Sequence, residues 1–533
     1  MTVFTKKDVQ EDSVKGLDKF GKYQLVQYFW LCLPLFTVSM MHVNYVFIAE
    51  HTEYRCIVPE CENRNASIQV PEWWPTDVDA QCERPIFYPD YNTSDQICKN
   101  TSIFNFVAKC DQWIYENDNS IISTFNLACQ SWKATLVGTI HNAGMMLSMV
   151  TTGWISDKVG RKPAMIFCSF GGFVGVFKIF ATNFNVYLAI EFLESFIASG
   201  LYNVGVILLI EIGGESKRVT AGVLFSYAVY LGEVVFAAIS MGFKYWKHVM
   251  LAIYSPMVLY ISYIFILKES TRWQMIRGKM GEAKSTFKLI ARMNKVNISD
   301  DEIDVMSDED MRSKFNVELQ KEKENFKDII GSKAIVTRLV VTAICFFTSS
   351  FLYYGLVVNA IYLPGDKYVN FILASVTSFP GDLIAFYCLN KFGRRITLQC
   401  GYLTCAVFLI AQTYTPEHII WLKVLLFLIG KLGVVICFTS IYTYAMELFP
   451  TSVRGSLFGF GNTVARVGGM LAPLTPLLTA QFTALPTILF AVTSVLSAFA
   501  TSFTPETKYL PLFDTIAQIN AYKTAESDVN THL

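Results

Sequence analysis

The chain has 533 residues, of which 53% are hydrophobic and only 17% are charged. Soluble globular chains carry about 25% charged residues, so the deficit points to a protein that lies in a lipid bilayer. The formal net charge is zero, which leaves no overall basic field and argues against nucleic acid as a partner.

The N-terminal segment, residues 1–22, is polar and rich in lysine. It lacks the short apolar core of a cleaved signal peptide, so we expect the first apolar stretch to remain in the membrane as a helix. A spanning helix needs roughly 20 mostly apolar residues. Twelve such stretches follow along the chain: 23–48, 134–155, 164–182, 185–212, 220–242, 247–267, 336–361, 369–389, 397–415, 419–446, 456–479 and 483–503. The expected fold is therefore all-α and polytopic.

Basic residues set the expected orientation of these spans. Arg161, Arg394 and Arg454 lie in the short loops after the second, eighth and tenth spans. Because positive loops stay in the cytoplasm, both termini and the loops after even-numbered spans are predicted to be cytoplasmic. Lys244 and Lys247, after the fifth span, run against this pattern.

Residues 49–133 form a long loop that the same rule places outside the cell. It contains six cysteines that we expect to form three disulfides, with the pairing left open: Cys56, Cys61, Cys82, Cys98, Cys110 and Cys129. It also contains three Asn-x-Ser/Thr acceptors for N-glycosylation: Asn65, Asn92 and Asn100. The two features support each other, because both are typical of an extracellular segment.

A second long loop, residues 268–335, is predicted to lie inside. It is dense in mixed charge, as in Lys321-Glu322-Lys323-Glu324, and we expect it to be helical and solvated. The sequence does not separate a plain linker from a regulatory element.

The chain also repeats itself. Gly160 and Gly393 follow the second and eighth spans within similar basic motifs. Glu211 and Arg218 end the fourth span at the same separation as Glu447 and Arg454 at the tenth. Glu269 and Glu506 end the sixth and twelfth spans. These features recur at nearly one spacing, which predicts two parallel six-helix halves with a substrate site between them, the layout of major facilitator transporters. The division is a tail (1–22), a first bundle (23–267), a linker (268–335), a second bundle (336–503) and a tail (504–533).

The repeated motifs have a physical interpretation. Glycine in a tight inner turn allows a positive φ, and Arg218 and Arg454 are the expected partners of Glu211 and Glu447. We interpret the set as a cytoplasmic latch that breaks and re-forms as the halves rock; a static topology anchor is the alternative. The predicted gating residues are Asp157, Gly160, Arg161, Glu211, Arg218, Gly393, Arg394, Glu447 and Arg454.

Several motifs resemble a known family. The stretch 153–162, Gly-Trp-Ile-Ser-Asp-Lys-Val-Gly-Arg-Lys, is similar to the major facilitator signature between helices 2 and 3. The stretches 123–129, 269–273, 353–359 and 447–454, together with the cysteine-rich first outer loop, resemble solute carrier family 22, the organic cation, organic anion and carnitine transporters. The resemblance covers nearly the whole chain and implies transport of small organic ions. Asn390 departs from the pattern, where an acidic residue is usual, and so does Glu191, where relatives often carry Arg.

Ionisable residues inside predicted spans are the candidates for substrate contact. By the resemblance, Arg466 would face the central cavity and meet a substrate carboxylate, and its planar fork suits bidentate contact. Pairing with Asp382 is the alternative, and it does not exclude the substrate role. Asp382 could hold a cation, and Lys431 could pair across the cavity. Three tyrosines are candidates for holding quaternary ammonium groups by cation–π attraction: Tyr202, Tyr353 and Tyr354.

No ATP-binding loop, zinc-type spacing or nucleophile motif appears in the sequence, so neither an enzyme, a metal nor a cofactor is expected. We expect a multi-pass plasma-membrane carrier that works by alternating access and binds a small organic ion. Arg466 favours a carboxylate, whereas Asp382, Glu194 and Glu233 favour a cation, and a carnitine-like zwitterion satisfies both. The alternatives are a sugar-type facilitator and a non-transporting receptor; association into homo-oligomers is left open.

Overall fold

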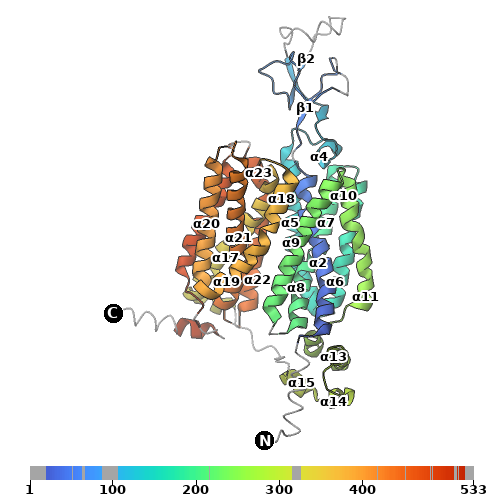
Figure 1. Ribbon diagram of the computed structural model, residues 1–533, viewed down its shortest axis with the longest axis vertical. Helices are drawn as coiled ribbons and strands as arrows, with labels where there is room; N and C mark the ends of the chain where they lie inside the picture. The colour runs from blue at the N-terminus through green and yellow to red at the C-terminus, as the bar shows by residue number, and fades with distance from the viewer. Residues whose placement is uncertain are drawn as a thin grey trace, which may run out of the picture.

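The computed structural model describes residues 20–521, apart from residues 51, 60, 63–65, 87–105, 215–216, 315–325, 417, 451, 480–481, 483, 509, 511–512 and 514. Within this part the molecule is mainly helical, and long helices run side by side in two groups (Figure 1). The first group contains α2 (Lys22–Ile48), α5 (Ser131–Val159), α6 (Arg161–Gly172) with η2 (Phe173–Phe180), α7 (Phe184–Ala198) with α8 (Gly200–Gly213), α9 (Arg218–Gly242), and α10 (Trp246–Tyr254) with η4 (Ser255–Ser262) and α11 (Tyr263–Ile266).

The second group repeats this arrangement in the other half of the chain. It contains α17 (Lys333–Asn359) with η5 (Ala360–Tyr362), α18 (Lys367–Val376) with α19 (Ser378–Phe392), α20 (Arg394–Tyr414), α21 (Ile420–Leu448), α22 (Arg454–Leu471) with η6 (Ala472–Leu474) and α23 (Thr475–Leu478), and α24 (Leu485–Ala500) with η7 (Thr501–Phe503). The predicted all-α, polytopic fold is confirmed.

Ten helical segments of the described residues are long and apolar enough to cross a membrane. The two predicted spans outside this set, 134–155 and 456–479, correspond to α5 and to α22 with α23. These two elements pack against each other, and they carry polar side chains such as Asn142 and Arg466 at their contact. Their lower hydropathy follows from this position, because a helix that faces the other half does not need an apolar surface all round.

Small residues let the helices approach closely. A side chain at Gly401 of α20 would meet Cys437 of α21 at 2.5 Å, and one at Gly433 would meet the Gly401 carbonyl at 2.8 Å. Within a bilayer the hydrophobic effect does not drive helices together, because lipid tails are as apolar as the side chains. Close backbone approach of this kind supplies van der Waals contacts that hold the helices together instead. Among the described residues, the two halves meet mainly where α5 packs against α22 and where α9 packs against α18.

The loop between α2 and α5 forms a small disulfide-bonded module at one end of the bundle (Figure 1). Strand β1 (Tyr54–Cys56) pairs antiparallel with β4 (Trp113–Tyr115), and β2 (Glu83–Ile86) pairs with β3 (Phe106–Lys109). The short helix α4 (Ile121–Thr124) leads from this module to α5.

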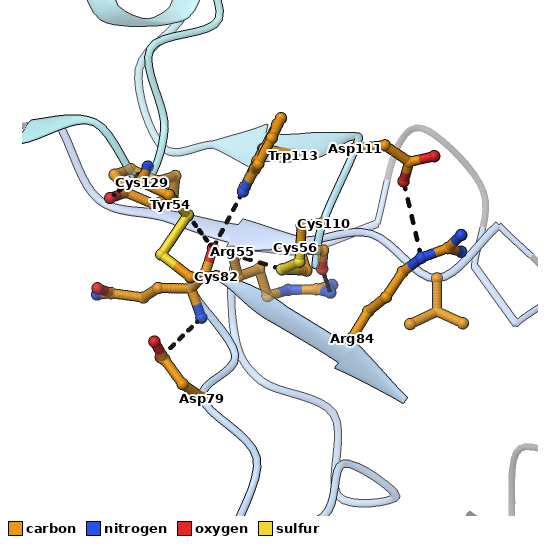
Figure 2. Close-up of a disulfide and its surroundings, with 12 residues drawn as sticks. Tyr54, Arg55, Cys56, Asp79, Cys82, Arg84, Cys110, Asp111, Trp113 and Cys129 are labelled. Carbon is orange, nitrogen blue, oxygen red and sulfur yellow. Dashed lines mark hydrogen bonds and ion pairs between the residues drawn. A yellow bond between two sulfur atoms is a disulfide. The ribbon is translucent and has the colours of Figure 1, made fainter. Parts of the chain in front are cut away.

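Disulfides cross-link this module (Figure 2). Cys56 is bonded to Cys110, and Cys82 to Cys129. Cys61 is also disulfide-bonded, whereas Cys98 lies outside the described residues. Two of the three expected disulfides are therefore confirmed and their pairing is established. The predicted glycosylation sites also lie outside the described residues: Asn65, Asn92 and Asn100.

The linker lies at the opposite end of the bundle from β1 and β2 (Figure 1). Its described part is helical, as predicted: α12 (Thr271–Ile276), α13 (Met280–Asn294), α14 (Asp300–Val305), α15 (Asp308–Lys314) and α16 (Phe326–Gly331). Asn294 of α13 accepts a hydrogen bond from the backbone of Tyr23 at 2.9 Å and donates one to Gln24 at 2.9 Å. The linker is thereby fixed to the start of the first bundle. The charge run at 321–324 lies outside the described residues.

Candidate functional site

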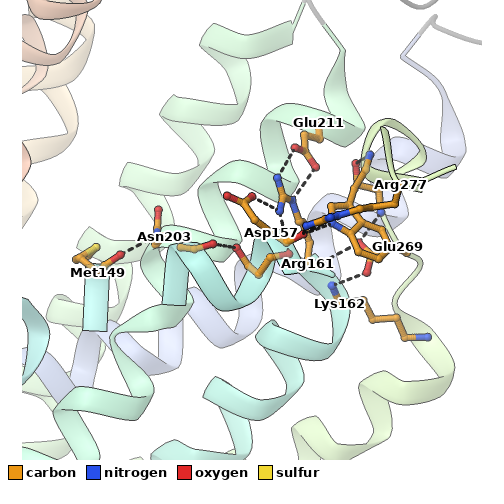
Figure 3. Close-up of polar contacts among 12 residues, drawn as sticks. Met149, Asp157, Arg161, Lys162, Asn203, Glu211, Glu269 and Arg277 are labelled. Carbon is orange, nitrogen blue, oxygen red and sulfur yellow. Dashed lines mark hydrogen bonds and ion pairs between the residues drawn. The ribbon is translucent and has the colours of Figure 1, made fainter. Parts of the chain in front are cut away.

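The turn between α5 and α6 organises one polar network, which Figure 3 shows. Gly160 has φ of 121°, a conformation that favours glycine, and a Cβ at this position would collide with the Glu269 carboxylate. The turn brings Arg161 back against the end of α5. Arg161 then donates to Asp157 at 2.6 Å and lies 3.3 Å from a carboxylate oxygen of Glu211 on α8.

Glu269, just after α11, closes this network. Its two carboxylate oxygens accept hydrogen bonds from the backbone amides of Arg161 and Lys162, each at 3.1 Å. Burial raises the pKa of Glu269, whereas these amide hydrogen bonds favour its ionised form. Arg277 and Trp273 of the linker donate to the backbone carbonyl of Asp157, at 2.6 and 2.9 Å. The turn, the helix ends and the linker are therefore tied into one unit.

The second half contains the same network. Gly393 has φ of 97°, and Arg394 contacts Glu447 of α21 at 2.7 Å. Glu506 accepts from the backbone amides of Arg394 and Arg395, at 2.8 and 2.9 Å. The repeat seen in the sequence is therefore a repeat of contacts. Glu269 and Glu506 had no assigned role in the sequence, although their shared spacing was the available signal.

One expectation about these networks was wrong. Glu447 was expected to pair with Arg454, but it contacts Arg394 and Thr507, and Arg454 donates to the backbone carbonyl of Phe449 at 3.1 Å. Glu211 likewise contacts Arg161. The side chain of its expected partner, Arg218, lies outside the described part of the chain.

Arg466 lies where the two halves meet. It is half-buried on α22, and its Nη1 donates to the Met145 sulfur of α5 at 2.7 Å and to the Tyr354 hydroxyl of α17 at 3.2 Å. Among the described residues no carboxylate oxygen lies within 4.0 Å of this guanidinium. The alternative pairing with Asp382 is therefore not formed.

Asp382 is a buried carboxylate on α19 of the second half. Its Oδ1 accepts a hydrogen bond from Thr439 at 2.5 Å, and Tyr230 of α9 in the first half faces the group. Its Oδ2 has no hydrogen-bond partner in the described part of the chain. Asp382 therefore holds an oxygen without a geometrically defined hydrogen bond beside the contact between the halves, although the hydroxyls of Tyr230 and Ser226 lie close to the carboxylate.

Tyr353 connects two more of the predicted charges. Its hydroxyl donates to Glu233 of α9 at 3.2 Å, while its ring lies 3.6 Å from the Lys431 ammonium of α21. Lys431 is completely buried and donates to the Tyr353 carbonyl at 3.2 Å. Glu233 Oε2 has no partner among the described residues. Lys431 and Glu233 thus both contact Tyr353, and the pairing of Lys431 across the cavity stays a prediction.

A buried charge cluster inside the first half was missing from the sequence-based predictions. Lys178 of η2 donates to Glu191 at 2.7 Å, to Glu194 at 3.1 Å and to the Tyr254 hydroxyl at 2.8 Å. Glu191 also lies 2.6 Å from His141 of α5. All five side chains are 0% exposed. The available signal was a lysine inside an apolar span, because such a residue requires a partner.

The two halves are also joined at the end of the bundle that carries the disulfide-bonded module. Lys367, the first residue of α18, contacts Glu50 just after α2 at 2.5 Å. Phe47 stacks on Tyr368, with 5.1 Å between the ring centroids, and Thr139 of α5 donates to the Met470 carbonyl of α22 at 3.2 Å. Ionic, aromatic and hydrogen-bond contacts therefore close the two halves against each other at this end.

Comparison with known proteins supports this description. A sequence model of the sugar (and other) transporter family matches residues 91–517. The chain is 29% identical over 521 residues to the organic cation transporter protein of Drosophila melanogaster, covering 95% of this chain and 93% of that protein. It is 27% identical over 533 residues to organic cation/carnitine transporter 2 of Homo sapiens, covering 94% and 92%. Solute carrier family 22 member 3 of Mus musculus is 25% identical, covering 96% and 95%.

Among solved structures, the xylose transporter XylE from E. coli in an inward open conformation matches with a TM-score of 0.55. The identity is 14%, and the match covers 71% of this chain and 87% of that one. This likeness concerns the fold alone. The resemblance to solute carrier family 22 that the sequence motifs indicated is confirmed by the named relatives.

Proposed function

Because the chain belongs to the sugar (and other) transporter family, we propose that it carries small organic ions across a membrane by alternating access. Its relatives include proteins named organic cation transporter and organic cation/carnitine transporter. In this proposal the substrate binds between the two halves, and a rocking motion exposes it to one side of the membrane and then to the other.

One observation carries the proposal, namely the state of Arg466. It contacts both halves, through Met145 and Tyr354, and has no carboxylate partner among the described residues. A half-buried guanidinium without a counter-ion is partly desolvated at a cost, and a substrate carboxylate would supply two charge-assisted hydrogen bonds to its fork. A neutral sugar site has no need of such a group.

Two carboxylate oxygens without hydrogen-bond partners among the described residues, both beside the contact between the halves, narrow the substrate class. Asp382 Oδ2 and Glu233 Oε2 have no hydrogen-bond partners in the described part of the chain, and both groups lie beside the contact between the halves. A cationic headgroup could neutralise either one. A carnitine-like or betaine-like zwitterion therefore satisfies both signs of charge, and it is our first choice of substrate.

The two polar networks are the proposed gates. Each ties a Gly-Arg turn to a glutamate on the fourth helix of its half, Arg161 to Glu211 and Arg394 to Glu447. These networks and the linker lie at the end that the positive-inside pattern assigns to the cytoplasm. We therefore place the protein in the plasma membrane, with both termini cytoplasmic and the disulfide-bonded module outside.

Uptake of three labelled probes in the same oocytes tests the proposal: L-carnitine as a zwitterion, tetraethylammonium as a cation and benzoate as an anion. We expect Arg466→Ala to lower uptake of the two carboxylates about 100-fold or more, because each hydrogen bond to a charged group contributes about 1.5–3 kcal/mol. Surface biotinylation should be unchanged. Arg466→Lys keeps the charge without the planar fork, so we expect it to recover only part of the uptake.

Arg292→Ala provides the matched control. This arginine is 69% exposed in the linker, where its pairing with Asp300 contributes little, so uptake should equal that of the native chain. Unchanged carboxylate uptake in Arg466→Ala would remove Arg466 from the site. Uptake of a sugar but of no ion would make the chain a sugar-type facilitator, and ligand binding without flux would make it a receptor.

A further inference from the structure

A chain of hydrogen bonds links two buried histidines to the charge cluster of the first half. His42 Nδ1 of α2 lies 2.7 Å from His141 Nε2 of α5, and His141 Nδ1 lies 2.6 Å from Glu191. His42 is 3% exposed and His141 is 0% exposed. The far nitrogen of His42, Nε2, has no hydrogen-bond partner among the described residues. The proposed transport mechanism does not use this series of hydrogen bonds.

The order of partners determines which atoms carry hydrogen. Glu191 is held ionised by the Lys178 ammonium at 2.7 Å, so His141 Nδ1 is assigned as the donor to Glu191. In a neutral His141, Nε2 must then accept, and His42 Nδ1 must donate to it. A neutral His42 therefore presents Nε2 as a bare lone pair, withdrawn from water and without a donor.

When a proton binds at this lone pair, the positive charge can move to a site where it is stabilised. With Nε2 protonated, His42 can pass its Nδ1 proton along the 2.7 Å hydrogen bond to His141. The positive charge then lies on His141, directly beside the Glu191 carboxylate. Only N–H bonds form and break in this transfer, and one proton enters while none leaves.

The charge balance of the cluster also favours an added proton. A single ammonium, that of Lys178, contacts two carboxylates, Glu191 and Glu194. Before the histidines are counted, this buried group therefore contains one more acid than base. A proton on His42 or His141 makes the two signs equal, which reduces the penalty for burying net charge.

The histidine pair also lies close to the proposed substrate site. Arg466 contacts Met145, which is one helical turn from His141 on the same face of α5. The His42 ring packs on Tyr202, with 4.7 Å between the ring centroids. The charged and titratable groups that face the pair from neighbouring elements are Tyr45, Lys178, Glu191, Glu194, Tyr202 and Arg466.

Arg466 couples the two sites electrostatically. Its positive charge, like that of Lys178, opposes a positive charge on His42. A substrate carboxylate bound to Arg466 would offset that repulsion, so the carboxylate and the proton would each strengthen the binding of the other. A site with this reciprocity is able to carry both together.

We propose that His42 and His141 bind a proton that crosses the membrane together with a carboxylate-bearing substrate held at Arg466. The inference rests on the proposed function, because it requires transport of such a substrate. The proton comes from water on the side to which the halves are open, binds Nε2 of His42, and leaves from the same atom after the halves have rocked.

Purified full-length protein in liposomes that contain a pH-sensitive dye provides the test, with L-carnitine and benzoate as probes. We expect each probe to acidify the lumen as it enters, with about one proton per molecule. Uptake should rise as the outer pH falls, by at most about tenfold per pH unit for a single proton. His42→Gln should abolish both effects, while it retains exchange of labelled for unlabelled probe at equal pH, which needs no net proton movement.

His248→Gln is the matched control, because His248 is exposed at the start of α10 and lies outside the chain of hydrogen bonds. It should behave as the native protein does. Uptake without lumen acidification in the native protein would overturn the inference and leave the proposed transport intact. A native pH dependence in His42→Gln would also overturn it. Failure of both probes to enter at any pH would instead reject the proposed carboxylate transport.

Discussion

Replacing Lys178 with methionine removes the ammonium that holds two buried carboxylates together. Lys178 contacts Glu191 at 2.7 Å and Glu194 at 3.1 Å, and all three side chains are 0% exposed. Methionine fills a similar volume but leaves both acids without this partner. Removing one member of a buried ion pair typically costs about 3–5 kcal/mol, which is a roughly 10²- to 10⁴-fold fall in the ratio of folded to unfolded protein.

Chemical unfolding of the purified protein in detergent micelles would measure this loss. The slope of the transition should be the same in the native chain and in Lys178→Met, so that a lower midpoint reports stability alone. Lys244→Met is the matched control, because Lys244 is exposed in the loop after α9. We expect that control to stay within about 0.5 kcal/mol of the native chain.

A second substitution separates charge from packing. Lys178→Met combined with Glu194→Gln leaves one fewer uncompensated acid, while Glu191 keeps its contact with His141. The double variant should therefore be more stable than Lys178→Met by at least about 1 kcal/mol. The reasoning is refuted if Lys178→Met loses less than about 1 kcal/mol, or if the double variant recovers nothing.

Two further predictions concern the closures at the ends of the bundle. Gly393→Ala should lower the free energy of unfolding by about 1–2 kcal/mol, because φ is 97° and the new Cβ would meet the Glu506 carboxylate at 2.6 Å. Gly455→Ala is the control, because its new Cβ meets nothing within 4 Å and should not destabilise the protein. Equal unfolding midpoints for the two variants would contradict this prediction. Glu50→Gln should weaken the outer closure by about 1 kcal/mol. An impermeant maleimide should then label a Thr139→Cys reporter several-fold faster, and unchanged labelling would show that the ion pair does not hold this end closed.

The two polar networks at Gly160 and Gly393 show how much could be predicted from the spacing of motifs along the sequence. Two motifs at one offset predicted the repeat and the importance of Gly160 and Gly393. Arg454, assigned to Glu447 from proximity along the chain, is not its partner. Arg394 contacts Glu447 instead, and Arg161 reaches Glu211 only after the glycine turn has folded it back. Two residues 50 positions apart come together through helix packing, which no local pattern records.

For the cysteines and the buried charges too, the sequence did not reveal which residues are partners. An even set of cysteines predicted disulfides, but only the folded module decides that Cys82 meets Cys129. Glu191 and Glu194 could be recognised as deep from hydropathy alone. Their shared partner Lys178 lies on another helix, in a span whose overall apolar character concealed its one charge.

Composition and periodicity by themselves determined a polytopic helical protein in two repeated halves, because the bilayer imposes length and hydropathy on every span whatever its neighbours are. They also identified Arg466 and Asp382 as costly groups within the membrane. Tertiary structure alone decided that these two do not pair, and that the histidines form a connected chain. The difference is physical: burial in lipid acts on each helix separately, whereas the partner of a charge depends on how the helices pack against one another.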